Sequence, residues 1–144
     1  MTDVVIRLAE PEDLMAIKAI ADEFRNELGF VYAAELVRGI SSGSVIVAEV
    51  GGQIVGFIYF RCRKDRIAII YAVAVTIGWQ RRGIGSKLVS ACKEVAKERG
   101  CVMMRLKCPI RSLGTNLFYK KLGFKLVGIV DGKKQKLMEW KKVI

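Results

Sequence analysis

The chain has 144 residues, 52% of them hydrophobic, and a formal net charge of +11 at pH 7. Its length predicts a single domain over residues 1–144, and its hydrophobic content excludes a disordered chain. There is no histidine, no C-x-x-C pair and no apolar run near the roughly 20 residues that span a bilayer. We therefore expect no metal site, no membrane partner and no signal peptide, and we expect a cytoplasmic location.

Positive charge is concentrated in the second half of the chain. Residues 1–60 carry four basic and nine acidic side chains, whereas residues 81–144 carry seventeen basic and four acidic ones. A net charge of this size usually indicates nucleic acid. The uneven distribution instead favours a polyanionic cofactor bound by the basic half and a cationic amine attracted by the acidic half.

Hydrophobic periodicity predicts the elements in chain order. A strand at 4–8 precedes an amphipathic helix that begins at Pro11 and ends at Gly29, and a shorter helix follows at 32–40. The pair Gly51-Gly52 predicts a hairpin of two strands, at 44–50 and 53–62. The remaining elements are a strand at 67–75, a helix from Gly85 to Gly100, a strand at 101–107, a helix at 112–122 and a hairpin of 124–130 with 135–140.

This order predicts a mixed sheet covered by helices, an α+β three-layer sandwich. Seven strands and four helices follow in the order β-αα-βββ-α-β-α-ββ. An all-parallel nucleotide-binding fold is excluded, because such folds alternate strand and helix throughout and the early hairpin interrupts that alternation.

The stretch from Ile67 to Ser90 carries the main functional signal. Residues 67–75 are apolar and rich in β-branched types, as in a strand buried on both faces. The loop 80–85, with sequence Gln-Arg-Arg-Gly-Ile-Gly, then leads into a helix. Glycines let backbone N–H groups approach a ligand closely, and a helix N-terminus favours an anion. The arginines at 81 and 82 can each donate two hydrogen bonds to a phosphate, so the stretch predicts a diphosphate site.

Two common phosphate motifs do not match this loop. A P-loop would need lysine where Ile84 stands, and the dinucleotide fingerprint would need glycine where Leu88 stands. What matches is Gln/Arg-x-x-Gly-x-Gly after a buried strand, followed about thirty residues later by Asn-Leu-Phe-Tyr-Lys-Lys-Leu-Gly-Phe at 116–124. With this combination the chain resembles the GCN5-related N-acetyltransferase (GNAT) superfamily from Val4 to Trp140.

The resemblance implies a mostly antiparallel GNAT-like sheet and an acyltransferase that moves an acetyl group from acetyl-coenzyme A (acetyl-CoA) directly to a primary amine. It assigns the pyrophosphate to the loop, the pantetheine arm to a strand that splays from its neighbour, and protonation of the departing thiolate to Tyr119, the catalytic residue. Ser112 is an alternative to Asn116 as a cofactor contact. The cofactor-binding residues it implies are Val73, Ala74, Val75, Gln80, Arg81, Arg82, Gly83, Ile84, Gly85, Ser86, Asn116 and Tyr119.

The general base is not evident from the sequence. Histone-type relatives have a glutamate at the position of Ile69, so Tyr71, Glu23 or Glu27 must be considered instead. A backbone N–H near Val75 is expected to stabilise the carbonyl oxygen. A covalent route through Cys108 is an alternative to direct transfer.

Two other function classes remain open. One is a non-catalytic module that binds acetyl-CoA, and the other is a nucleic-acid-binding protein that uses the basic half, although we do not expect nucleic acid as the partner. The acceptor is a peptide, protein or small-molecule amine, expected to be cationic, and the resemblance leaves a homodimer open. The lysines of the second alternative are Lys120, Lys121, Lys125, Lys133, Lys134 and Lys136.

Overall fold

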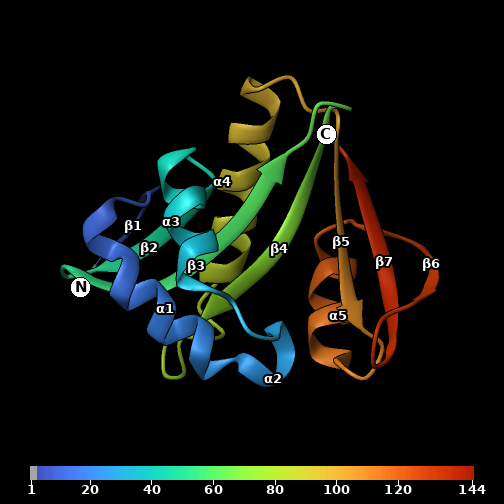
Figure 1. The fold of residues 1–144 in the computed structure, drawn as a ribbon, viewed down its shortest axis with the longest axis horizontal. Coiled ribbons are helices and arrows are strands. Elements are labelled where there is room, and N and C mark those ends of the chain that lie inside the picture. The colour runs from blue at the N-terminus through green and yellow to red at the C-terminus, as the bar shows by residue number, and fades with distance from the viewer. Residues whose placement is uncertain (1–2) are drawn as a thin grey trace.

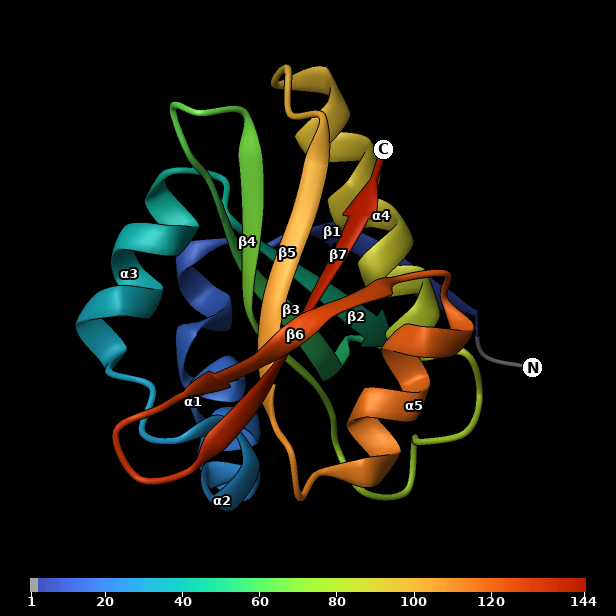
Figure 2. The same cartoon turned by 90° about the vertical axis from the view of Figure 1, so that its right-hand side faces the viewer.

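The computed structural model describes residues 3–144 as one seven-stranded sheet with helices on both faces (Figures 1 and 2). The order across the sheet is β1-β2-β3-β4-β5-β7-β6, and every neighbouring pair is antiparallel except β4 and β5. The predicted α+β fold is thus confirmed. The strands are β1 (Val4–Leu8), β2 (Val45–Val50), β3 (Gln53–Cys62), β4 (Ile67–Val75), β5 (Met103–Pro109), β6 (Lys125–Asp131) and β7 (Lys136–Val143).

The helices agree with the prediction apart from the first one. A 3₁₀ turn at Pro11–Asp13 precedes α1, and the predicted continuous helix is divided at Phe24, whose φ of −109° and ψ of 29° are not helical. No helix within residues 3–144 is both long enough and apolar enough to cross a membrane. The α-helices are α1 (Leu14–Glu23), the one-turn α2 (Arg25–Leu28), α3 (Ala33–Ser41), α4 (Ile84–Glu98) and α5 (Leu113–Lys121).

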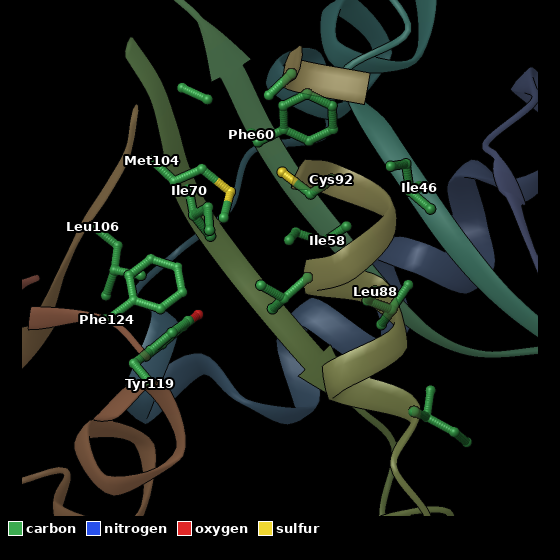
Figure 3. Packing of buried hydrophobic residues seen from close by; sticks show 14 of the residues in the cluster. Ile46, Ile58, Phe60, Ile70, Leu88, Cys92, Met104, Leu106, Tyr119 and Phe124 are labelled. Carbon is green, nitrogen blue, oxygen red and sulfur yellow. The ribbon is translucent and has the colours of Figure 1, made fainter. Parts of the chain in front are cut away.

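Two hydrophobic clusters hold the helices on the sheet. The larger lies on the face covered by α4 and α5, where Leu88 and Cys92 of α4 pack against Ile58 of β3 (Figure 3). The smaller lies on the opposite face, where Ile17 of α1 and Leu36 of α3 pack on β2, β3 and β4. Burial of these side chains is the main stabilising contribution that the fold offers.

A β-bulge at Tyr71 changes which residues of β4 face which cluster. Tyr59 of β3 pairs with Ala72 and Phe60 pairs with Ile70, so Tyr71 is left without a partner in β3. Ile70 consequently belongs to the larger cluster and Ala72 to the smaller one. One extra residue therefore reverses the alternation of a strand at that point.

Strands β4 and β5 are paired over only three residues each. Residues 67–69 pair in parallel with residues 103–105, and beyond them the two strands diverge, as Figure 1 shows. Strand β5 begins two residues later than predicted. The backbone N–H of Cys101 donates a 2.9 Å hydrogen bond to the carbonyl of Ala96, so this residue caps the C-terminal end of α4 instead of pairing in the sheet. The divergence opens the sheet between residues 70–75 and 106–109.

Candidate active site

Two adjoining cavities lie where the sheet opens. The interstrand cavity, of about 560 Å³, is lined by residues 70–75 of β4, residues 106–109 of β5 and residues 26–29 around α2. The loop cavity, of about 850 Å³, lies between the end of β4, the loop before α4 and the first turns of α5. Both cavities are lined by residues 73–75 and by Tyr119, so these residues lie at their junction.

Most of the predicted cofactor-binding residues line the loop cavity. Ten of the twelve predicted residues lie in its wall. The two that do not are Arg82 and Asn116. The structure thus brings together the end of the buried strand, the glycine-containing loop and the tyrosine, which span more than forty positions of the sequence.

The loop has the backbone geometry of an anion site. Gly83 has a φ of +78°, a conformation that glycine adopts without strain, and it precedes α4 without providing a side-chain cap. The first N–H groups of α4, at residues 84–86, therefore belong to the cavity wall and have no capping side chain. A side chain at Gly85 would place its Cβ 3.3 Å from Phe118, so glycine lets α4 approach α5 closely.

Contacts within the loop hold it against β4. The side-chain amide of Gln80 donates a 2.9 Å hydrogen bond to the carbonyl of Val75. The guanidinium of Arg82 lies 4.6 Å from the centre of the Trp79 ring, which packs against the larger cluster. Arg82 thus covers the outside of the loop, whereas Arg81 lines the cavity.

Tyr119 is almost completely buried and faces β4 from α5. Its ring packs edge-to-face on Phe118 and Phe124, and Figure 3 shows its hydroxyl directed toward β4. No other group within residues 3–144 forms a hydrogen bond with this hydroxyl. Burial raises the pKa of Tyr119, with a smaller contribution from Cys108, so the phenol is protonated at neutral pH.

Cys108 lies at the end of β5 in the wall of the interstrand cavity. Burial raises the pKa of its thiol to about 12. Since the thiolate is the nucleophilic form, this environment leaves almost no reactive Cys108 at neutral pH. Burial of this thiol therefore disfavours a covalent route through Cys108.

Asn116 forms its side-chain hydrogen bonds with the protein itself. Its Nδ2 donates to the carbonyls of Pro109 (3.0 Å) and Ser112 (2.9 Å), and its Oδ1 accepts from Nε1 of Trp140 at 2.8 Å. Ser112 precedes α5 without capping it through its side chain and lines the interstrand cavity. Sequence reasoning missed Thr115, which lines both cavities; it lies four residues before Tyr119, on the same face of α5.

The candidate bases are placed differently. Glu23 accepts hydrogen bonds from Oγ1 of Thr76 (2.7 Å) and from the backbone N–H of Ile77 (2.9 Å). Glu27 is exposed and is the single carboxylate that lines the interstrand cavity among residues 3–144. Tyr71 lines the same cavity and is half exposed.

Comparison with known proteins identifies the family. Residues 41–126 match the model of the acetyltransferase (GNAT) domain. An uncharacterized N-acetyltransferase of Methanocaldococcus jannaschii is 35% identical over 92 residues, which are 60% of this chain and 41% of that protein. The chloroplastic GCN5-related N-acetyltransferase 4 of Arabidopsis thaliana is 35% identical over 72 residues, which are 50% of this chain and 25% of that protein. The chain thus covers less than half the length of either relative.

Solved structures show the same fold at low sequence identity. Ard1 from Thermoplasma volcanium superimposes with a TM-score of 0.88 at 24% identity, covering 98% of this chain and 97% of that one. The protein yncA of Salmonella typhimurium, solved with acetyl-CoA, superimposes with a TM-score of 0.82 at 20% identity, covering 98% and 94%. Together with the domain match, these similarities place the chain in the acetyltransferase (GNAT) domain family.

Proposed function

We propose that this protein transfers the acetyl group of acetyl-CoA directly to a primary amine. One observation carries the proposal: the loop cavity, built around a helix N-terminus, meets the interstrand cavity at a buried tyrosine. A diphosphate-bearing donor and an amine can thereby enter from different sides and meet at Tyr119.

The loop cavity has the groups that the donor needs. The N–H groups at 83–86 and the guanidinium of Arg81 would hold the pyrophosphate, with Arg82 adding positive charge nearby. The unpaired edge of β4 at residues 73–75 would take the pantetheine arm as an extended segment, since it offers free backbone groups. The side chain of Asn116 would support α5 rather than touch the donor, because its hydrogen bonds are taken by the protein.

The reaction needs few groups from the protein. The lone pair of the neutral amine attacks the thioester carbonyl, and a backbone N–H near Val75 would stabilise the negative charge on its oxygen. The C–S bond then breaks, and the hydroxyl of Tyr119 would give its proton to the leaving thiolate. The proton that the attacking nitrogen loses as the amide forms would restore the phenol. Because burial that raises the pKa of a phenol also disfavours a thiolate beside it, Tyr119 remains an effective donor there.

Glu27 would serve the amine. It is the carboxylate of the interstrand cavity, and its negative charge would attract a cationic amine. The carboxylate would then accept a proton from this amine, directly or through a water molecule. Glu23 is less suited to this role, because both of its carboxylate oxygens already accept hydrogen bonds.

A panel of amines tests the proposal. Peptides with free N-termini, peptides with one lysine, a polyamine and an aminoglycoside are each mixed with the protein and acetyl-CoA, and free coenzyme A is measured with a thiol reagent. With at least one amine, free coenzyme A should appear, and mass spectrometry should show that the mass of this amine has increased by 42 Da. If acetyl-CoA binds by calorimetry but no amine is acetylated, the protein is a non-catalytic acetyl-CoA-binding module.

A further inference from the structure

On the face opposite α4 and α5, a row of cations extends across the sheet and is interrupted on β4 by Ile69. The helices α1 and α3 pack on β2, β3 and β4, and on this side β5, β7 and β6 are open to solvent (Figure 2). Cross-strand pairing connects Arg61 to Ile69, Ile69 to Arg105, Arg105 to Lys141 and Lys141 to Lys125. Directly paired residues project from the same face, so these side chains form one row across five strands.

The burial of neighbouring residues shows from which side of the sheet these cations project. Met104 and Leu106 flank Arg105 and belong to the cluster beneath α4 and α5, as does Trp140 beside Lys141. Since successive side chains of a strand alternate, the cations project to the opposite, open side. We call Arg61, Arg105, Lys107, Lys125 and Lys141 the cationic face.

The cationic face adjoins the interstrand cavity. Lys107 belongs to both, because it lies on β5 two residues beyond Arg105 and lines the cavity wall. Tyr71 also lines the cavity and exposes 49% of its surface at the same place. An acceptor whose amine lies in the interstrand cavity therefore has its flanking groups over these cations.

Charge and dimensions favour an acidic polypeptide as the occupant. Strands are spaced by about 4.8 Å, so the row spans roughly 19 Å, which about six residues of extended peptide cover. Glu139 lies among the cations, 3.0 Å from Arg105, so the positive charge is divided into separate sites, which suit discrete carboxylates better than a continuous phosphate backbone. Among residues 3–144, Tyr71 is the one exposed aromatic side chain on a strand, fewer than a stacking platform for bases uses.

We propose that the cationic face binds carboxylates flanking the amine of a polypeptide acceptor. This inference rests on the proposed acetyl transfer and names its acceptor class: a peptide or protein amine followed or surrounded by Asp and Glu. Electrostatic attraction of this kind raises the rate of encounter and selects among acceptors, while the chemistry depends on the cavities.

Binding of matched peptides tests the face independently of catalysis. Each peptide carries one free amine, a C-terminal fluorophore and either Glu or Gln around the amine, and affinity is measured by anisotropy. The Glu peptide should bind about fivefold more tightly than the Gln peptide at low salt, and 1 M salt should abolish the difference. Equal affinities at low salt would contradict the proposal.

Charge-reversal variants test whether the preference for the Glu peptide depends on the cationic face. Lys141→Glu and, separately, Lys125→Glu should remove the preference for the Glu peptide, whereas Lys97→Glu, the same charge change on an exposed residue of α4, should keep it. Circular dichroism should show that all three variants fold. If Lys97→Glu weakens binding as much as Lys141→Glu, the effect is one of overall charge and the proposed face is wrong.

Two further outcomes separate the hypotheses. If a single-stranded RNA oligonucleotide binds more tightly than the Glu peptide and displaces it, the face belongs to nucleic acid and the proposal of an acidic polypeptide is wrong. If the Glu preference follows Lys141 but no peptide is acetylated, the face is supported and the proposed acetyl transfer fails. If Glu and Gln peptides are acetylated with the same kcat/KM, the proposed acetyl transfer is supported and the proposed role of the cationic face is wrong.

Discussion

The indole of Trp140 donates a 2.8 Å hydrogen bond to the side-chain oxygen of Asn116 inside the larger cluster. This bond joins β7 to α5, and the amide nitrogen of Asn116 binds two backbone carbonyls before and at the start of the same helix. The position of α5, and with it that of Tyr119, thus depends on a polar network around the buried side chain of Asn116.

Replacing Asn116 by alanine should therefore destabilise the fold. The change leaves the Trp140 N–H and two carbonyls without their partner, and we expect the free energy of unfolding to fall by about 2 kcal/mol. Urea denaturation measures the loss, and Trp140→Phe should show a smaller one. An unchanged stability together with a raised KM for acetyl-CoA would mean that Asn116 contacts the cofactor, as the family resemblance implies.

Tyr119→Phe should lower turnover by about tenfold or more. The ring and its packing on Phe124 remain, so the KM for acetyl-CoA and the melting temperature should change little. Steady-state assays of coenzyme A release provide both constants, and Tyr32→Phe serves as a control for loss of a phenol outside both cavities. Unchanged turnover in Tyr119→Phe would remove this hydroxyl from the mechanism.

The two carboxylates near the site should respond differently to amidation. Glu27→Gln should lower kcat/KM for the amine about tenfold without a loss of stability, because Glu27 is exposed and faces the cavity. Glu23→Gln should instead lower stability by about 1 kcal/mol, since charge-assisted hydrogen bonds to Thr76 and Ile77 become neutral ones. A stronger kinetic effect at Glu23 than at Glu27 would reverse these assignments.

Arg81 allows charge and backbone strain to be separated. Its φ of +63° is a left-handed conformation that costs a non-glycine residue about 1 kcal/mol. Arg81→Gly and Arg81→Ala should raise the KM for acetyl-CoA equally, because each removes the guanidinium. Thermal denaturation should show the glycine variant to be more stable than the alanine variant. A KM that rises in only one of them would point to loop conformation rather than charge.

Much of the fold could be predicted because its signals are local. The apolar run at 67–75 gave the bounds of β4, and Gly51-Gly52 gave the hairpin of β2 and β3. The break at Phe24 was missed, because the hydrophobic pattern continues across it to Leu28. Glu23, the last residue of α1, contacts Thr76, fifty-three positions away, and local periodicity does not reveal such a partner.

The sequence predicted which residues form the candidate site better than it predicted the directions of their side chains. Gly83 and Tyr119 belong to short patterns, so a single sequence suffices to locate them. The direction of the Asn116 side chain depends on Trp140, and the reversal of faces in β4 depends on the extra residue at Tyr71. Neither is visible in alternation or spacing, because both result from pairing between distant strands.

The three-residue pairing of β4 with β5 has a consequence for the sheet as a whole. An open sheet ordinarily has two edges, whereas this one has two more in its interior, along residues 70–75 and 106–109. Unpaired edges are the places where foreign strands add to a sheet and where amide protons exchange with solvent most readily. This protein therefore carries a strand-sized gap at its centre, and any extended molecule that fills the gap makes the sheet continuous.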